Sequence, residues 1–542
     1  MLHLEDLWFL PFLLYAETHY RFPNFFSLLY KREPEIIADA PHRVEPGSQI
    51  PLLIVVKDAH LFPCRLDQIT TEIRHEAKVV RTQTHLPQVM ELSERLSSFI
   101  IMLDPSDLKG WIEIDVEFSI TVMGRPKVYH NDNHRFSSRN PLRVFLARHS
   151  LPRFPNLYLG DPHVHSTYTE DQVEFGSPLR ETRVLAQAMG LSFFCVTDHS
   201  YDLDDRLDSY LENDPEVPKW RLFQAGVDHL NAEPSDCIIV RGEEVSCRNS
   251  EGRNIHLLLF GQREFVHGTG DSADRALRTE SEFSLSEALA LRSESGVAIA
   301  AHAFEPVPFL QRLLLGRGEW LTKDLAQAGL SGLQIVNGAL DGGFSRGLEH
   351  WTHQLLLGNR LSALAGNDAH GNFNRYRQIG IPFLTMREST SHIFGRMRTG
   401  VFVDEGLEEQ SILRALGAGQ SILTDGPIAR VQFSPRADLH DNRGRSEARS
   451  MRLMIDAIST PEFGEVASVK VIIGTIGRLA EQVAFEYEGV GSFQYQTEVP
   501  IAAAGADYAR VEIWTLANGA FDATRHFCLT NPVWLTGRPA RS

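Results

Sequence analysis

The chain has 542 residues, of which 43% are hydrophobic and 23% are charged, and its formal net charge at pH 7 is -17. This composition is that of a globular protein, and no long biased tract indicates disorder. At roughly 150 residues per domain, the length predicts several domains. The negative charge disfavours nucleic acid and anionic membranes as partners, so we expect a small-molecule substrate and no nucleic-acid or membrane partner.

The first 40 residues contain the apolar stretch LWFLPFLLY, which resembles part of a signal peptide. A signal peptide has a basic region before its apolar core, whereas this one is preceded by Glu5 and Asp6 and interrupted by Pro11. We therefore predict that residues 1–40 are a packed lead-in segment. The five cysteines of the chain are scattered without a CxxC pair, which indicates reduced thiols and a cytoplasmic protein.

Residues 41–152 contain short segments in which apolar and polar residues alternate, such as WIEIDVEFSITV. A period of two is typical of half-buried β-strands, and clusters of turn-forming residues separate the segments. We predict a β-sandwich domain in this region.

Residues 153–426 show a different pattern, in which apolar strand-like runs alternate with amphipathic helical segments. Ser177 and Pro178 supply the start of one such helix, which Gly190 can end. This alternation indicates an α/β domain with a parallel sheet covered by helices, either open or closed into a barrel. Residues 427–542 return to strand-like segments and predict a second, C-terminal β-sandwich domain.

Histidines and acidic residues gather at or near the ends of the predicted strands between residues 157 and 370. These residues are His163, His165, Asp198, His199, Glu243, Glu244, His256, His302, Asp368 and His370. The carboxyl ends of parallel strands meet at one face of an α/β fold, so we expect these side chains to share one cleft. Adjacent strand residues face opposite ways, so only one of Glu243 and Glu244 can point into the cleft, and we choose Glu244.

The residue types in this cleft predict a metal centre. Imidazole and carboxylate groups together suit Zn²⁺, Mn²⁺ or Fe²⁺. A single catalytic zinc uses three protein ligands, so this larger set predicts two or three divalent ions with a carboxylate between them. Closely spaced ions hold a bridging hydroxide as nucleophile and stabilise charge on a phosphoryl or carbonyl oxygen, which makes hydrolysis the expected reaction.

The motifs HVH at 163–165, TDH at 197–199, GEE at 242–244 and NDAH at 367–370, with His256 and His302 between them, resemble the PHP (polymerase and histidinol phosphatase) superfamily of metallohydrolases. The resemblance covers roughly residues 157–425. It implies a distorted (β/α)7 barrel with a trinuclear site at the carboxyl ends of its strands, here flanked by the two β-sandwich domains. The segment ALGAGQSILTDGP and the appended β-domains are similar to the carbaryl-hydrolase-like branch of the superfamily.

The resemblance also implies a role for each ligand. The first metals would be held by His163, His165, Glu244 and Asp368, with Glu244 as the bridge. The second would be completed by His256 and His302, and the third by His199, His370 and an acidic residue after the HVH motif. Family members commonly have an Asp seven or eight residues after the first His. Those positions are Glu170 and Asp171 here, and we choose Asp171; if neither coordinates, the site is dinuclear.

We therefore predict a metal-dependent hydrolase, with Glu244, Asp368 and His199 as catalytic residues. A phosphate ester is the expected substrate, because clustered cations suit a dianionic transition state, and a carbamate, ester or amide is the alternative. Arg375 is a candidate clamp for an anionic substrate, and Tyr201 a candidate pocket residue. A hypothesis of another class is a non-catalytic metal- or carbohydrate-binding protein.

Overall fold

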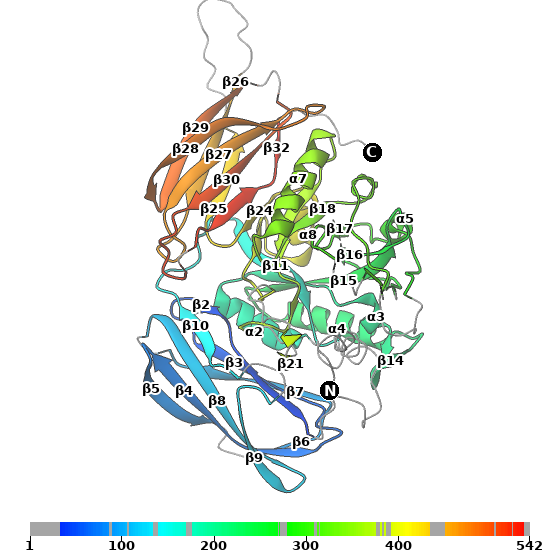
Figure 1. The fold of residues 1–542 in the computed structure, drawn as a ribbon, viewed down its shortest axis with the longest axis vertical. Coiled ribbons are helices and arrows are strands. Elements are labelled where there is room, and N and C mark those ends of the chain that lie inside the picture. The colour runs from blue at the N-terminus through cyan, green and yellow to red at the C-terminus, as the bar shows by residue number, and fades with distance from the viewer. Residues whose placement is uncertain are drawn as a thin grey trace, which may run out of the picture.

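The structure is a computed structural model of the chain. It describes residues 33–85, 89–105, 108–133, 139–169, 176–268, 270, 279–307, 312–313, 315–374, 380–381, 384–385, 392–433, 450–502, 506–522 and 524–535. In Figure 1 the N-terminal strands (blue) form one end of the molecule and the C-terminal strands (orange to red) the other. The helices and the strands of the central region lie between these ends.

The N-terminal region consists of two sheets that pack around a shared hydrophobic core. An antiparallel sheet contains, in spatial order, β1 (Glu35–Asp39), β3 (Ile50–Lys57) and β7 (Leu96–Leu103). The second contains β2 (Arg43–Val44), β10 (Leu142–Leu146), β8 (Gly110–Val122), β4 (Cys64–His75) and β5 (Lys78–His85), with β6 (Met90–Leu92) on β4 and β9 (Arg125–His130) on β8. Every second residue of β8 from Ile112 onward is buried, as the alternation of WIEIDVEFSITV predicts.

The central region is built on seven consecutive strands of a larger sheet. Their spatial order is β19 (Ser362–Gly366), β18 (Gly332–Asn337), β17 (Val297–Ala300), β16 (Asn254–Phe260), β15 (Ile238–Arg248), β12 (Phe193–Val196) and β11 (Leu157–His165). A short strand just after β19, β20 (Ala369–His370), pairs with the end of β11, so the first and last of these strands approach each other. This closure brings His370 beside His165.

The helices of the described residues all fall within the central region of the chain. They are α2 (Leu179–Met189), α3 (Ser200–Leu203), α4 (Pro218–Ala232), α5 (Leu285–Ala290), α7 (Gly342–Leu356) and α8 (Glu409–Gly417). Two small hairpins are formed by β13 (Asp205–Arg206) with β14 (Ser209–Asn213) and by β21 (Gly380–Ile381) with β22 (Leu384–Thr385). None of the helices within the described ranges has the length and apolar character that crossing a membrane requires.

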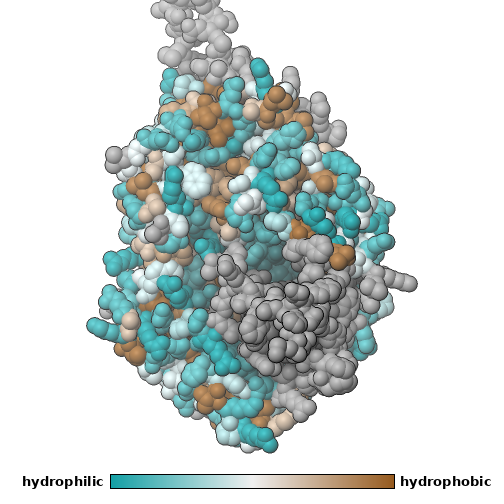
Figure 2. Space-filling model, in the orientation of Figure 1, coloured by the Kyte–Doolittle hydropathy of each residue, from teal (hydrophilic) through white to brown (hydrophobic). Residues whose placement is uncertain are grey.

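The C-terminal strands continue the central sheet. Beyond β11 the order is β23 (Arg398–Phe402), β24 (Ser421–Thr424), β31 (Phe527–Thr530), β30 (Tyr508–Thr515), β27 (Val466–Gly474) and β28 (Gln482–Ser492), with β32 (Val533–Trp534) on β30. A separate antiparallel sheet contains β25 (Ile428–Phe433), β26 (Ser450–Ile458) and β29 (Gln494–Ala502). On the face shown in Figure 2, hydrophobic residues are scattered among hydrophilic ones.

The predicted fold class, an α/β fold with a distorted (β/α)7 barrel between two β-sandwich domains, is wrong, because the protein is mostly β. Only a short turn between Arg248 and Asn254 joins β15 to β16, so the two strands are antiparallel and no helix crosses between them. β17 is also antiparallel to β16. The central strands then run without a break into the C-terminal ones, which form part of a single fifteen-stranded sheet.

Candidate metal centre

β11 ends on His163 and His165, whose side chains lie on the same side because side chains alternate along a strand. Both histidines are fully buried, and their Nε2 atoms lie 3.3 Å apart. Asp161 lies on β11 two residues before His163. Its buried carboxylate accepts hydrogen bonds from the Asn367 side chain (2.7 Å) and the Gly395 amide (2.9 Å). These bonds tie the end of β11 to the segments after β19 and before β23, so the fold holds both imidazoles in place.

The Glu244 carboxylate, on β15, lies at the centre of a group of five imidazoles. Their ring nitrogens lie 2.6–3.3 Å from one of its two oxygens and belong to His163, His165, His199, His256 and His302. Glu243 faces the other way, and its carboxylate accepts a hydrogen bond from the Val266 amide (3.1 Å). The centre therefore contains one of the two adjacent glutamates, and both oxygens of that glutamate lie close to imidazole nitrogens.

Asp368 and His370 enter the centre from the segment that follows β19. Asp368 Oδ1 lies 3.1 Å from His165 Nε2 and 3.3 Å from His163 Nε2. The His370 ring stacks on that of His165, with centroids 4.0 Å apart. Asp368 (φ 53°) and His302 (φ 27°) both have left-handed backbone, a conformation that costs energy in residues other than glycine. The surrounding structure thus holds two of these residues in strained conformations at the centre.

Among the described residues, the ligand atoms form three overlapping groups, in each of which all atoms lie within 4.8 Å of one another. The groups are His163, His165, Glu244 and Asp368; His199, Glu244 and His256; and His165, His199 and His370. His165, His199 and Glu244 each belong to two groups. Shared members between neighbouring groups suit several closely spaced ions better than one isolated ion.

The chemistry of these donors fits divalent cations. Nearby histidines outweigh the effect of burial and hold the pKa of Glu244 and Asp368 well below the usual range, so both carboxylates are ionised. Burial, together with the charge of His165, lowers the pKa of His199 well below its usual value, so its imidazole is neutral. His199 Nδ1 is buried, lies 3.3 Å from Glu244 Oε2 and makes no hydrogen bond within the described residues. Such a nitrogen is suited to a metal ion.

Two buried polar residues, Gln334 and Asp198, form hydrogen bonds that orient the proposed metal ligands. Gln334 Oε1, on β18, lies 2.8 Å from His163 Nδ1 and accepts a hydrogen bond from the His302 amide (3.1 Å). The Asp198 carboxylate accepts hydrogen bonds from the Ser166 amide and hydroxyl, both at 2.6 Å. Asp198 thereby fixes the turn that follows His165, and Gln334 leaves His163 Nε2 facing the centre.

The structure brings together eight of the nine predicted metal ligands. These are His163, His165, His199, Glu244, His256, His302, Asp368 and His370. The ninth, Asp171, lies outside the described residues, as do its alternative Glu170 and the predicted clamp Arg375. Tyr201, the predicted pocket residue, stacks on His199 with ring centroids 4.6 Å apart. It therefore lies beside the centre rather than within it.

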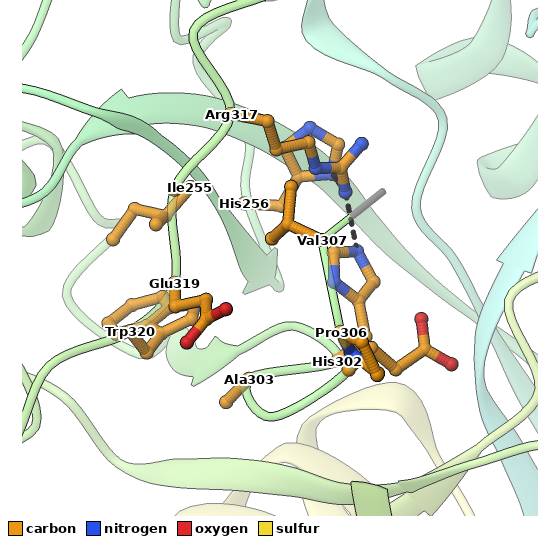
Figure 3. A pocket seen from close by; sticks show the side chains of 11 residues that line it. Ile255, His256, His302, Ala303, Pro306, Val307, Arg317, Glu319 and Trp320 are labelled. Carbon is orange, nitrogen blue, oxygen red and sulfur yellow. Dashed lines mark hydrogen bonds between the residues drawn. The ribbon is translucent and has the colours of Figure 1, made fainter. Parts of the chain in front are cut away.

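Arg317 is a neighbour of the centre that the sequence did not single out. Its Nη2 lies 3.1 Å from His256 Nδ1 and 3.3 Å from His302 Nε2 (Figure 3). It follows no strand-end motif and belongs to the segment GRGEW, so no sequence pattern pointed to it. Its only sequence signal is that it stands between two glycines.

Comparison with known proteins does not assign a family. No protein-family model and no curated protein matches the chain. Solved structures with a distant likeness include a β-glucuronidase of Bacteroides uniformis (9% identity, TM-score 0.18, 92% of this chain) and a β-D-mannosidase of Dictyoglomus thermophilum (7% identity, TM-score 0.22, 93% of this chain). The chain spans 60% of the length of the first and 67% of the second. Likeness at this level supports no conclusion about fold or function.

Proposed function

We propose that the protein is a metal-dependent hydrolase with the chemistry of the PHP superfamily, and that it acts on phosphate esters. One observation carries the proposal, namely the convergence of five imidazoles on the single buried carboxylate of Glu244. Structural metal sites are closed by few ligands, whereas overlapping ligand groups of this kind suit two or three exchangeable divalent ions. This supports an enzyme over a protein that merely carries ions.

The residues of the centre would have different roles in the reaction. Glu244 and Asp368 supply negative charge between the imidazoles, and their low pKa values keep them ionised across the range in which enzymes operate. Neutral His199 offers the lone pair of Nδ1, and Gln334 holds His163 in the orientation that exposes Nε2. When bound, divalent ions lower the pKa of a water and neutralise charge on the reacting oxygen.

Phosphate esters are the favoured candidate substrates because a centre with several cations would match the charge of a phosphoryl group. A carbamate, ester or amide is the alternative within the same chemistry. The five cysteines are all buried and free, which supports a reducing compartment, the cytoplasm.

A hydrolysis panel tests the proposal. The metal-supplemented protein is assayed on a phosphomonoester, a phosphodiester, an aryl ester and a carbamate, beside His256→Ala and the control His229→Ala. The His229 side chain is 72% exposed and belongs to none of the ligand groups found among the described residues, so we expect its removal to leave activity intact. We expect phosphoester hydrolysis that His256→Ala abolishes. Hydrolysis of the carbamate or aryl ester alone would replace the phosphoesterase assignment, and activity that survives His256→Ala would contradict the site.

A further inference from the structure

Residues 367–374, which we call the ligand segment, carry two of the proposed metal ligands and are held at both ends by hydrogen bonds. At the first end, the Asn367 amide and side chain donate to the buried carboxylate of Asp161 on β11 (3.2 and 2.7 Å). Between the ends, β20 pairs with β11 over two residues. Fixing a backbone costs conformational entropy, so a strand this short needs anchors on both sides. The position of His370 therefore also depends on what holds the second end.

The second end is held by the N-terminal region of the chain. The Phe373 amide donates to the carboxylate of Asp39, the last residue of β1 (2.9 Å), and the Phe373 carbonyl accepts from the His42 amide (3.0 Å). The next residue, Asn374, accepts from the Arg143 amide (3.0 Å) and donates to the Arg143 carbonyl (2.6 Å). Arg143 lies on β10. These four hydrogen bonds attach the ligand segment to two different strands and a connecting residue of the N-terminal region.

The contact between the two regions is buried at Phe373. Asp39 is 4% exposed and Phe373 is 1% exposed, and the Phe373 ring lies 5.0 Å from that of Phe394. The residue after Phe394 is Gly395, whose amide donates to the Asp161 carboxylate (2.9 Å). A buried amide that loses its acceptor is destabilising, so the bond to Asp39 resists breaking. The hold on Phe373 is therefore firm, and it extends through Phe394 towards the first anchor.

His370 depends on the second anchor more than Asp368 does. Asp368 directly follows Asn367 and so lies next to the first anchor, whereas His370 lies three residues before Phe373. Of the three ligand groups found among the described residues, His370 belongs only to the one that it forms with two other histidines. A shift at the second end of the ligand segment would thus disturb this group and leave the other two intact.

We propose that the N-terminal region is a positioning element of the metal centre, in which Asp39 and Asn374 hold His370 where it can bind an ion together with His165 and His199. Both residues act through the backbone that follows His370, and neither is itself a ligand. The inference rests on the proposed function, because the ion is one of those proposed for the centre. It gives the N-terminal region a part in metal binding.

The test compares the full wild-type chain with Asn374→Ala, Asp39→Asn and a matched control, Asn133→Ala. Asp39→Asn keeps the shape of the side chain but has one acceptor oxygen, whereas Asp39 uses one oxygen for the Phe373 amide and the other for the Ala40 amide (2.8 Å). The control residue makes the same pair of bonds as Asn374, because it accepts from a backbone amide (2.9 Å) and donates to a backbone carbonyl (2.8 Å). Both of its partners belong to the N-terminal region.

Cobalt is the probe. Each protein is freed of metal and titrated with Co²⁺, which is counted by elemental analysis and whose surroundings are followed by visible absorption. We expect Asn374→Ala and Asp39→Asn to bind one Co²⁺ per chain about 10- to 100-fold more weakly than wild type, with a changed spectrum, and to bind the remaining ions as wild type does. Asn133→Ala should unfold at a lower urea concentration than wild type but keep its cobalt affinity and spectrum, because Asn133 is buried and does not hold the ligand segment.

Three results would overturn the inference. They are cobalt binding by both variants within twofold of wild type, an equal loss of affinity in Asn133→Ala, and an equal loss of every ion in the two variants, since the hold would then not act on His370. If Asp39→Asn does not fold, Asn374→Asp, which keeps the acceptor and loses the donor, takes its place. A wild-type chain that binds no Co²⁺ would instead refute the proposed function itself, and the wild-type titration separates that outcome from a failure of the positioning residues.

Discussion

Replacing Gln334 by Met should weaken metal binding without removing any ligand. The side chain is buried, and Met has a similar volume, so packing changes little. Its Oε1 is the acceptor for two buried groups, the His163 ring and the His302 amide, and its Nε2 donates to Asn337 (2.8 Å). Each buried group left without its partner costs about 1–3 kcal/mol, so loss of the two hydrogen bonds to Oε1 should cost the metal-free protein about 2–6 kcal/mol. Loss of an orienting partner behind a ligand typically costs about 10- to 100-fold in metal affinity, which we expect here.

The matched control for this prediction is Gln354→Met, on α7. Gln354 is also buried, donates to the Thr322 carbonyl (3.1 Å) and accepts from Asn359 (2.6 Å), but it touches no ligand. Metal affinity is measured by competition with a chelating indicator, and stability by urea unfolding of the metal-free protein. We expect both variants to be destabilised and only Gln334→Met to lose affinity. The reasoning is refuted if Gln334→Met binds metal within twofold of wild type, or if Gln354→Met loses as much affinity.

Three further predictions concern the bridge, the pH dependence of stability and the junction between regions. Glu244→Gln keeps the shape of the side chain but removes its charge, so the variant should lose metal and activity together, as measured by elemental analysis and the hydrolysis assay. Retention of both metal and activity would contradict the assignment of Glu244 as the bridging ligand. Burial lowers the pKa of His526, but the carboxylates of Asp425 and Asp522 outweigh this effect and raise the pKa to about 9. Protonated His526 therefore stabilises the fold fully below about pH 6.5, and this contribution is lost as the pH rises through 9. Urea unfolding at pH 6 and pH 9.5 should show that wild type exceeds His526→Gln by about 3 kcal/mol more at the lower pH, and an equal difference at both would contradict the link. Glu462 pairs with buried Arg43 (2.9 Å), so Glu462→Gln should cost about 3 kcal/mol in unfolding free energy, and a cost below about 1 kcal/mol would contradict a structural role for the pair.

Much of the candidate site could be predicted from the sequence because its residues stand in short local patterns. HVH places two imidazoles on one side of a strand through alternation alone, and the same rule separates Glu244 from Glu243. Arg317 had no such signal, since its position depends on backbone contacts with Asn254, which lies 63 residues earlier in the chain. Contacts between distant segments leave no period in the sequence.

The fold class was also hard to predict from the sequence, because strand pairing depends on contacts between distant segments. The run NIHLLLF is buried along its whole length, and a strand buried on both faces has the same continuous apolar pattern whether its neighbours are parallel or antiparallel. The sequence therefore did not reveal that β15, β16 and β17 are antiparallel. The pairing of β24 with β31, which extends the central sheet into the C-terminal strands, joins segments about 100 residues apart and is likewise invisible to local patterns.

The most direct test of the central claim is the metal content of the full chain. Protein purified without chelators and supplemented with manganese or zinc is freed of loosely bound ions and measured by elemental analysis beside Glu244→Gln. The overlapping ligand groups predict two or three ions per wild-type chain and a loss of bound ions in the variant. Fewer than one ion per wild-type chain after supplementation would contradict the metal centre and the hydrolase proposed from it.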